Sequence, residues 1–443
     1  MPEAVDQLIH AEWIIPVVPE NTLLTDHSLV VKRGRIDAIL PTDQAAARYQ
    51  SAQEIRLPGH ALIPGLINSH THAAMALLRG LADDMPLMTW LNEHIWPAEA
   101  RWVNEEFIHD GTQLAVAEML LGGTTCFNDM YFFPDITGRV ASSAGIRAVL
   151  GLIAIDFPSA WASDGDDYLH KGLQVHDNFR TNPIIHTAFA PHAPYSVANP
   201  ILERIRTLAD ELEIPVHMHV HETHDEIVQG LQQHGGRPMA RLNDLGLLSP
   251  SLAAVHMTHL EEAEIELFAA AGGHVVHCPE SNLKLASGFC PVAALIEAGI
   301  NVALGTDGAA SNNDLDMFSE MRSAALLAKG VANDASALPA ARALSMATIN
   351  GARALGLQQE TGSLEPGKSA DLVAVDLNRI NTQPVYNPIS QIVYAAGREQ
   401  VSHVWVAGRH LVSEGELTTM NLQPLTSRSG EWRQRIQATD AGS

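Results

Sequence analysis

Residues 61–72 have the sequence Ala-Leu-Ile-Pro-Gly-Leu-Ile-Asn-Ser-His-Thr-His, in which an apolar run leads directly into two histidines. Residues 61–67 have the length and composition of a buried β-strand. In an extended segment residues i and i+2 point the same way, so His70 and His72 can offer two imidazoles to one metal ion. An isolated pair of this kind is weak evidence for a metal site without further support.

The same pattern, an apolar strand followed by an Ala-, Leu- and Glu-rich helical stretch, recurs along the chain. The eight strand candidates are residues 61–67, 123–128, 146–155, 184–190, 214–221, 252–259, 273–278 and 301–304. Helical stretches such as residues 201–212 and 260–271 separate them. Eight parallel strands alternating with helices are the number that a (β/α)8 TIM-type barrel requires. A dinucleotide-binding Rossmann fold has no support, because the chain contains no G-x-G-x-x-G.

Short segments of alternating apolar and polar residues bracket this central part and predict antiparallel strands. They are residues 7–15, 27–31, 36–40, 370–375 and 403–409. The two groups can pair as one small β-sandwich domain built from both chain termini. A chain of 443 residues suits one large catalytic domain and a smaller one. We therefore expect residues 1–61 and 359–443 to form the small domain, and residues 62–358 to form the barrel.

The composition disfavours several classes of protein. Hydrophobic residues make up 46% of the chain and charged residues 18%, a globular balance that can bury a sizeable core. The 27 Lys and Arg against 51 Asp and Glu give a formal net charge of −24, so the average surface field repels polyanions. A nucleic-acid-binding protein is therefore disfavoured, whereas a nucleoside without phosphate remains compatible.

Neither targeting nor disulfide signals are found in the sequence. The N-terminus lacks a basic leader, and no apolar run approaches the roughly 18 residues of a membrane span, so we expect no membrane attachment. The three cysteines, Cys126, Cys278 and Cys290, form no C-x-x-C pair and support neither a disulfide framework nor a thiolate zinc site. These features indicate a reducing, cytoplasmic compartment.

Three alternating histidines mark the fifth strand candidate, in Val216-His-Met-His-Val-His-Glu222. His217, His219 and His221 would share one face of an extended strand, which ordinary core packing does not readily explain. One or two of them could still be hydrogen-bonded core residues, and His217, deeper in the strand, is the first candidate. His221-Glu-Thr-His224 is not H-E-x-x-H, because the second histidine comes one position too early, so a thermolysin-like site is rejected.

Polar groups also follow two later strands. The sixth strand candidate ends in His256-Met-Thr-His259, and the eighth runs into Gly305-Thr-Asp-Gly308. Asp307 would then lie at the end of an apolar strand, where barrels expose their catalytic groups. It could instead cap the following helix. The four polar sites taken together favour chemistry over that alternative.

Eight short motifs extend from the first barrel strand to the last. They are Pro64-Gly-Leu-Ile-Asn-Ser-His-Thr-His72, Leu78-Arg-Gly80, Trp96-Pro-Ala-Glu99, Pro191-His-Ala-Pro-Tyr-Ser196, His219-Val-His-Glu222, His256-Met-Thr-His259, Ser281-Asn-Leu-Lys-Leu285 and Gly305-Thr-Asp-Gly-Ala-Ala-Ser-Asn-Asn313. With these motifs the chain resembles the amidohydrolase superfamily, within its branch of adenosine-type, guanine and triazine deaminases and chlorohydrolases. The resemblance is closest to the 5′-methylthioadenosine/S-adenosylhomocysteine deaminases, and both terminal β segments fit it too.

The resemblance implies a metal site. His70, His72, His219 and Asp307 would ligate one divalent ion, for which zinc suits the ligands best, although iron or nickel could occupy them. Relatives with two metals carry a carboxylated lysine at the end of the fourth strand. Residues 184–192 contain no lysine, so we expect a mononuclear site.

The resemblance also implies roles in the deamination of an aminopurine. Glu222 would shuttle a proton to ring nitrogen N1, while His259 would orient or deprotonate the attacking water. Asp307 would accept the proton of that water and pass it to the departing ammonia. Glu99 would bind the ribose hydroxyls and His192 the base or ribose, so that Glu99, His192, Glu222 and Asp307 together form the predicted substrate site.

One departure bears on the choice of substrate. Relatives that use S-adenosylhomocysteine have arginines after the third strand, which hold the carboxylate of the amino-acid tail. Residues 148–170 contain neither Lys nor Arg but include Asp156, Asp164, Asp166 and Asp167. We therefore expect 5′-methylthioadenosine or adenosine to be preferred over S-adenosylhomocysteine.

Two other functions remain open at this stage. On the same fold, a chlorohydrolase or a deaminase of guanine, triazine or another N-heterocycle would use the same metal and nearly the same carboxylates; the ribose carboxylate Glu99 would distinguish them. A catalytically silent metal-binding scaffold is disfavoured, because every ligand position and Glu222 are filled. The resemblance further implies a homo-oligomer.

Overall fold

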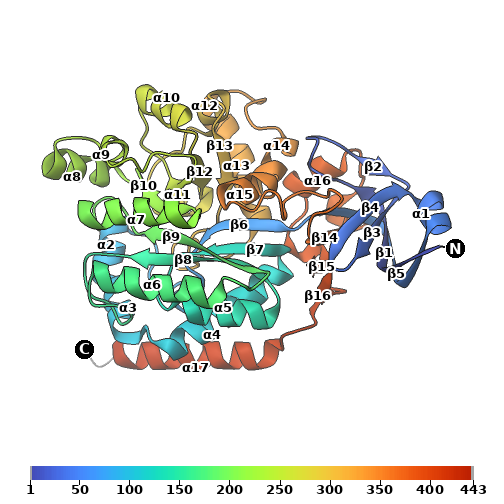
Figure 1. The fold of residues 1–443 in the computed structure, drawn as a ribbon, viewed down its shortest axis with the longest axis horizontal. Coiled ribbons are helices and arrows are strands. Elements are labelled where there is room, and N and C mark those ends of the chain that lie inside the picture. Colours follow the sequence, from blue (N-terminus) through green and yellow to red (C-terminus); the bar gives the residue numbers. More distant parts are fainter. Residues whose placement is uncertain (1, 441–443) are drawn as a thin grey trace.

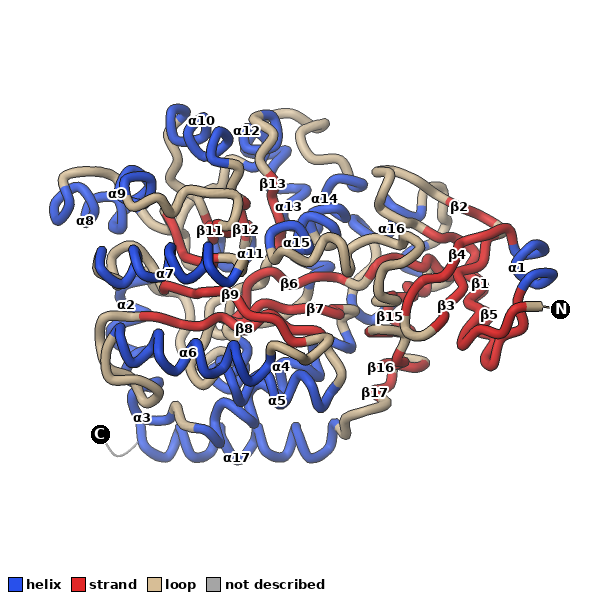
Figure 2. Tube along the Cα trace, in the orientation of Figure 1, coloured by secondary structure: helices blue, strands red, loops and turns tan. Residues whose placement is uncertain are grey.

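The computed structural model describes residues 2–440 and has two parts. Figure 1 shows a large part in which helices surround a group of strands, and a small part on the right, where strands from both ends of the chain meet. In Figure 2 the strands of the large part lie inside a layer of helices, whereas the small part consists mainly of strands.

The large part is a barrel of eight strands joined in chain order, each parallel to the next. The strands are β6 (Leu66–Thr71), β7 (Thr124–Asp129), β8 (Arg147–Ala154), β9 (Ile185–Pro191), β10 (Val216–Val220), β11 (Leu252–His256), β12 (His274–His277) and β13 (Asn301–Leu304). Almost all their residues are buried, as expected for strands covered by helices outside and by packed side chains inside. The predicted TIM-type barrel is confirmed.

The first barrel strand begins later than the sequence predicted. Residues 61–64 belong to β5 (Tyr49–Pro64) of the small part, and β6 begins at Leu66. Gly65 separates the two strands, and a Cβ atom there would lie only 1.9 Å from Oγ1 of Thr125. The chain therefore passes from one part to the other at a point where no side chain fits, and His70 lies within the strand.

Asn68 closes the barrel between its last and first strands. Its Oδ1 accepts a hydrogen bond from the backbone N–H of Thr306 (3.0 Å), and its Nδ2 donates to Oγ1 of the same residue (2.7 Å). The N–H of Asp307 donates to the carbonyl oxygen of His70 (3.0 Å). A Cβ atom at Gly305 would lie 2.7 Å from the backbone nitrogen of His70, so this close approach requires glycine.

Helices cover the outside of the barrel and follow its strands. They are α4 (Glu105–Leu121), α5 (Pro134–Ala144), α6 (Gly165–Phe179), α7 (Asn199–Leu212), α8 (His224–His234), α9 (Pro238–Asp244), α10 (Glu262–Ala271), α11 (Pro279–Lys284), α12 (Val292–Glu297), α13 (Met317–Ala332), α14 (Ala340–Met346) and α15 (Ile349–Ala354). Short helical segments after β6 are η1 (Ala73–Leu78), α2 (Leu87–Thr89), η2 (Trp90–Ile95) and α3 (Trp96–Trp102). The two helices expected from the sequence correspond to α7 and α10.

The strands of the small part form one mixed sheet of nine strands. They are β1 (Glu3–Ile14), β2 (Leu24–Thr25), β3 (His27–Lys32), β4 (Arg35–Pro41), β5, β14 (Leu372–Asp376), β15 (Val401–Val406), β16 (Arg409–Ser413) and β17 (Glu416–Leu417), with α1 (Thr42–Arg48) beside them. The strands from the two ends of the chain meet where β14 pairs antiparallel with β5. The predicted small β domain from both termini is thus confirmed, with all its strands hydrogen-bonded into a single sheet.

The C-terminal helix belongs with the barrel, although it falls inside the range 359–443 that we assigned to the small domain. Figure 1 shows α17 (Leu422–Asp440) running alongside α4. The indole of Trp432 is buried against Phe107 of α4, and its Nε1 donates to Oδ2 of Asp110 (2.9 Å). The last segments α16 (Pro388–Tyr394), η3 (Ile380–Thr382) and η4 (Arg398–Gln400) connect the strands of the sheet.

A buried ion pair joins the barrel to the small sheet at the amino end of the barrel. Arg147, the first residue of β8, donates from Nε to Oδ2 of Asp371 (2.9 Å), and both side chains are fully buried. Its other nitrogens donate to the Ser369 hydroxyl (3.0 Å) and the Pro183 carbonyl (3.2 Å). The second oxygen of Asp371 accepts from the backbone N–H of Ala407 (2.7 Å). Each charge in this interface therefore has an opposite charge and further hydrogen bonds.

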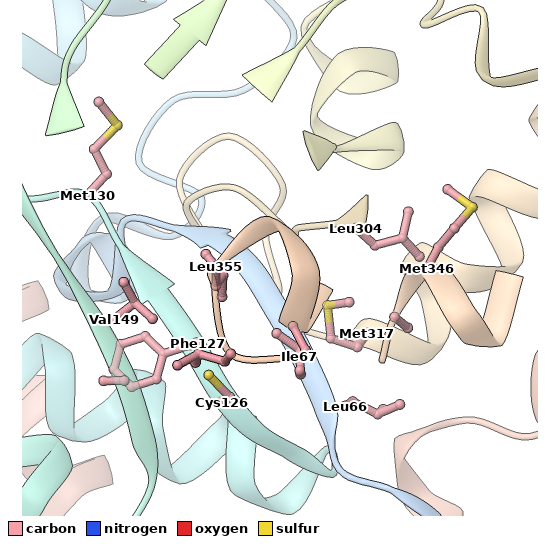
Figure 3. Close-up of a cluster of buried hydrophobic side chains, with 14 of the residues drawn as sticks. Leu66, Ile67, Cys126, Phe127, Met130, Val149, Leu304, Met317, Met346 and Leu355 are labelled. Carbon is pink, nitrogen blue, oxygen red and sulfur yellow. The ribbon is translucent and has the colours of Figure 1, made fainter. Parts of the chain in front are cut away.

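The main core lies between the barrel strands and the helices around them. Figure 3 shows one part of it, where Leu66, Ile67, Cys126, Phe127 and Val149 lie on neighbouring strands. The three cysteines are buried and unpaired, in agreement with the prediction that they form no disulfide framework. Within residues 2–440, no helix combines the length and the apolar character needed to cross a membrane.

Candidate functional site

Three histidines converge at the carboxyl end of the barrel. His70 lies near the end of β6, His72 directly follows that strand, and His219 lies on β10. One ring nitrogen from each lies within 4.8 Å of the others, and Nε2 of His219 is 3.1 Å from Nε2 of His70. Two strands that are far apart in the sequence thus bring three imidazoles to one point.

Asp307 completes this group from the residues that follow β13. Its Oδ1 lies 3.3 Å from Nε2 of His70 and 3.2 Å from Nε2 of His72. Its Oδ2 accepts hydrogen bonds from the hydroxyls of Ser281 (2.6 Å) and Ser311 (2.7 Å), which leaves Oδ1 facing the imidazoles. The backbone of Asp307 is left-handed, with φ of 62°, a conformation that non-glycine residues rarely adopt outside functional sites and turns.

Hydrogen bonds fix which nitrogen each imidazole presents. Nδ1 of His72 lies 2.6 Å from the carbonyl oxygen of Met130, and Nδ1 of His219 lies 2.8 Å from that of His192. A carbonyl can only accept, so both Nδ1 atoms carry hydrogen and both Nε2 atoms are the ones turned toward the same point. Three imidazole nitrogens and one carboxylate oxygen around a point are a donor set that suits a divalent transition metal such as zinc.

Burial keeps most of these rings neutral, as coordination requires. It lowers the pKa of His70 to about 4 and that of His219 well below its usual range. Burial also lowers the pKa of His72, but the hydrogen bond and charge of Asp307 outweigh it and raise that pKa to about 9. Burial acts to raise the pKa of Asp307, but its hydrogen bonds to His70 and His72 outweigh burial and hold that pKa well below its usual range.

His217, His219 and His221 differ in surroundings, contrary to the expectation that they share one face of a strand. His219 lies with the two histidines of the first strand, whereas His217 is one layer deeper, with Nε2 2.8 Å from Nδ1 of His70. His221 follows the end of the strand with φ of 54°, and its Nε2 accepts from the backbone N–H of Met239. The turn after Val220 therefore directs the side chain of His221 away from His219 and toward the backbone of Met239.

A cavity of about 110 Å³ opens above this group. It is lined by His72, Met75, Leu87, Trp90, Leu91, Ile95, Trp96, Glu99, Met130, Tyr131, Phe132, Ile153, Ile155, Phe157, His192, Tyr195, His219, Glu222, His256, Leu285, Asp307 and Ser311. Aromatic and aliphatic side chains form most of the wall, and polar groups gather on the side of the four converging residues. Such a wall with few convergent polar groups is typical of a site for a small organic molecule.

Glu222 lies in this cavity directly after β10. Its backbone N–H and that of His221 both donate to the carboxylate of Glu226 (2.8 and 2.9 Å), which holds the strand end in place. Burial raises the pKa of Glu222, and the nearby His256 opposes that shift. A buried carboxyl with a raised pKa in a cavity is a candidate for a general acid or base.

His259 does not reach the cavity, and the role predicted for it conflicts with its position. Its Nε2 lies 2.7 Å from the carbonyl oxygen of Ser287, and its ring contacts that of His224. His256, which ends β11 with φ of 74°, lines the cavity instead. Its Nδ1 lies 2.8 Å from Oδ1 of Asn282, and its Nε2 is 3.8 Å from Oε1 of Glu222.

The other two of the four predicted substrate residues, His192 and Glu99, also line the cavity. His192, at the end of β9, has Nδ1 2.8 Å from the Ser196 hydroxyl, and burial lowers its pKa to about 3, so the ring is neutral. Glu99 lies on α3, and its Oε1 accepts a hydrogen bond from the phenol of Tyr131 (2.6 Å). Sequence reasoning missed Tyr131; its signal would have been the polar tip that follows the second strand, in Asp129-Met-Tyr131.

Comparisons with known proteins agree with this geometry. Residues 61–411 match the amidohydrolase family. A protein of Teredinibacter turnerae named 5-methylthioadenosine/S-adenosylhomocysteine deaminase is 54% identical over 98% of both chains. A Methanothermobacter thermautotrophicus protein named 5′-deoxyadenosine deaminase is 43% identical over 82% of this chain and 84% of its own.

Among solved structures, the crystal structure of an adenosine deaminase from Xanthomonas campestris with bound zinc has a TM-score of 0.98. It is 54% identical and covers 99% of this chain and 100% of its own. The family match and the near-complete coverage by these relatives lead to one conclusion: the chain belongs to the amidohydrolase family.

Proposed function

We propose that this protein is a metal-dependent hydrolytic deaminase of adenine nucleosides. It would convert 5′-methylthioadenosine or adenosine to the inosine analogue and ammonia. One observation carries the proposal: a donor set for a divalent ion, an acidic group with a raised pKa and a second carboxylate line the same largely apolar cavity. The names of the Teredinibacter and Xanthomonas relatives support the same activity.

His70, His72, His219 and Asp307 would hold one divalent ion, and zinc is the ion that we propose. Three imidazoles and a carboxylate suit it, and the Xanthomonas relative was solved with zinc bound. When bound, such an ion would lower the pKa of a water molecule to about 7 and so make hydroxide available near neutral pH.

Glu222 would carry the proton that the purine ring needs. Attack at C6 places negative charge on the ring unless N1 gains a proton, so a carboxylic acid must face N1. Burial raises the pKa of Glu222, which favours a carboxyl that can hold and transfer a proton.

His256, rather than His259, would orient the attacking water. Nδ1 of His256 donates a hydrogen bond to Oδ1 of Asn282. Nε2 of His256 can then accept a hydrogen bond from water. The first proton of the water would pass to Glu222 and on to N1, and Asp307 would take the second proton and give it to the departing ammonia. Its Oδ2 accepts two serine hydroxyls, whereas Oδ1 accepts the backbone N–H of Gly308 and faces the imidazoles, so Oδ1 is the atom that would exchange this proton.

Glu99 and His192 would bind the nucleoside. A carboxylate is a natural acceptor for two neighbouring hydroxyls, and the neutral His192 can hydrogen-bond to the base or the ribose. The remaining wall, which includes Trp90, Ile95 and Phe157, is apolar and suits a methylthio group.

The charge of the cavity favours a neutral substrate over S-adenosylhomocysteine. Among the described residues that line it, none is Lys or Arg. Arg241 lines a neighbouring cavity, but its guanidinium donates to the carbonyl oxygens of Pro194 and Val197 and to Oδ1 of Asn199. An anionic tail would therefore lack a free cation to pair with.

A deamination screen with metal analysis of the same preparation tests the proposal. We expect 5′-methylthioadenosine and adenosine to release ammonia, S-adenosylhomocysteine to react more slowly, and guanine and chlorotriazines not to react. Faster turnover of guanine or a triazine would replace the proposal by the alternative activity on the same fold. Equal rates for the homocysteine conjugate and methylthioadenosine would contradict the argument from charge.

The variant Glu222→Gln tests the assignment of the acid. We expect kcat to fall by about 10²- to 10⁴-fold while the metal content stays unchanged, because the amide cannot deliver a proton. Retained activity would refute the role of Glu222.

A further inference from the structure

The phenol of Tyr131 is hydrogen-bonded to the carboxylate of Glu99 and has no part in the function proposed above. Tyr131 follows β7 on the rim of the barrel, whereas Glu99 lies on α3, which belongs to the segment that covers the cavity. Their hydrogen bond, 2.6 Å from Oη to Oε1, joins these two elements. Tyr131 is only 5% exposed, and both residues line the cavity.

The pair presents only acceptors to a ligand. A phenol has one hydrogen to donate, and Tyr131 gives it to Glu99. Burial and the adjacent Glu99 raise the pKa of Tyr131 well above its usual range, so the phenol keeps that hydrogen at neutral pH. The lone pairs of the phenol oxygen and the second oxygen of Glu99 then remain, and neither atom makes a further hydrogen bond within residues 2–440.

The pair also lies beside the metal-ligand group and not within it. The centroids of the Tyr131 and His72 rings are 6.2 Å apart, and the hydroxyl of Tyr131 donates its hydrogen bond to Glu99 on α3. A ligand that reaches both the four converging residues and this pair must carry its hydrogen-bond donors at some distance from the reacting atom. Two hydroxyls on neighbouring carbons match two neighbouring acceptors.

We propose that Tyr131 is a specificity-determining residue, whose phenol together with Glu99 forms an acceptor edge that selects nucleosides with an intact 2′,3′-diol. The inference rests on the proposed nucleoside deaminase activity. Tyr131 has two parts in it: it fixes the orientation of the Glu99 carboxylate, and its oxygen accepts a hydrogen bond from one sugar hydroxyl. Loss of the phenol oxygen should therefore weaken recognition of the sugar and leave the chemistry at the purine ring intact.

The test compares the wild type with Tyr131→Phe, a variant that removes a single oxygen atom. The substrates are adenosine, 2′-deoxyadenosine and 3′-deoxyadenosine. We expect Tyr131→Phe to lower kcat/KM for adenosine by about five- to tenfold, mainly through KM, as the loss of one hydrogen bond predicts. The two deoxynucleosides should lose less, so the preference of the enzyme for the diol should shrink.

Tyr195→Phe is the matched control, because Tyr195 lines the same cavity and its phenol makes no hydrogen bond among the described residues. It should change the rates for all three substrates by the same factor. A second variant, Glu99→Gln, and the double variant show whether the two residues act together: the loss in the double variant should then be smaller than the product of the two single losses.

The outcomes separate this inference from the proposed function. If the wild type deaminates the nucleosides and Tyr131→Phe lowers all three rates equally or not at all, Tyr131 does not recognise the sugar and only this inference fails. If the wild type deaminates none of them, the proposed function fails and the inference fails with it.

Discussion

The two ends of the barrel both bury ionisable side chains, but they pair them differently. At the amino end Arg147 and Asp371 satisfy each other, and their remaining hydrogen-bonding atoms bind Ser369, Pro183 and Ala407. At the carboxyl end three imidazoles and one carboxylate turn toward a common point, and no Lys or Arg lines the cavity among the described residues.

The difference separates a structural from a functional use of buried charge. A pair that is complete in itself holds two parts of a chain together, and removing one partner leaves an uncompensated charge. Ligand atoms that face each other need a bound cation between them. The free energy of binding that cation then offsets the cost of burying these atoms in the folded protein. Substitutions at the two ends should therefore have opposite effects on folding and activity.

The largest effect should come from His219→Ala at the carboxyl end. We expect loss of the metal and a fall in kcat of on the order of a thousandfold or more, because the ligand set loses one of its imidazoles. Metal analysis and steady-state kinetics measure both losses. The urea midpoint of metal-free His219→Ala should lie close to that of the metal-free wild type. A much lower midpoint of the variant would contradict the contrast drawn between the two ends of the barrel.

Asp371→Asn at the amino end should do the reverse. Breaking a buried ion pair while keeping Arg147 costs about 3–5 kcal/mol of folding free energy, which urea unfolding measures. Activity per folded molecule should stay near that of the wild type, because the pair lies at the opposite end of the barrel. The double variant Arg147→Met/Asp371→Leu should recover part of the loss, since it leaves no charge unpaired.

His217 allows the deeper contact of the metal site to be tested. His217→Phe removes the nitrogen that faces Nδ1 of His70 and should weaken metal affinity by about 10- to 100-fold, as measured by competition with a chelator. His277→Phe is the matched control, because His277 is equally buried on β12 and has an unpartnered Nδ1. Equal metal affinities of the two variants would show that the contact with His70 does not orient the ligand.

The smallest effect concerns the dependence of stability on pH. Burial acts to raise the pKa of Asp371, but the charge and hydrogen bond of Arg147 outweigh it and hold that pKa below its usual value. The pair therefore contributes its full stability above the unfolded pKa of about 3.9, and loses it as the pH falls through the folded value. The urea midpoint of the wild type should decline below about pH 4 more steeply than that of Asp371→Asn; parallel curves would contradict this.

The sequence predicted the barrel well, because apolar runs of strand length alternate with helical stretches. It misjudged the first strand, because residues 61–67 read as one apolar run and the close contact of Gly65 with Thr125, which separates the two strands, is not visible in the sequence. It also assigned α17 to the small domain, because the burial of Trp432 against α4 is a long-range contact that no local pattern reveals.

In the site, the alternation of residues along a strand indicated which histidines could meet, but not where each strand ends. His256 and His259 both follow the sixth apolar run, and the left-handed backbone at His256 decides that this residue turns to the cavity. His221 is lost from the group for the same reason. Tyr131 escaped notice because an aromatic residue after a strand is usually a packing residue.

The pairing of Pro64 with Leu372 has a consequence for the order in which the protein forms during synthesis. The edge of β5 that pairs with β14 stays unpaired until the ribosome has synthesised the barrel strands and then β14. Until then the first segments of the chain expose backbone groups that can bind another nascent chain. On a ribosome stalled before Leu372, β5 would lack its partner β14, and its unpaired edge could bind a strand of another chain.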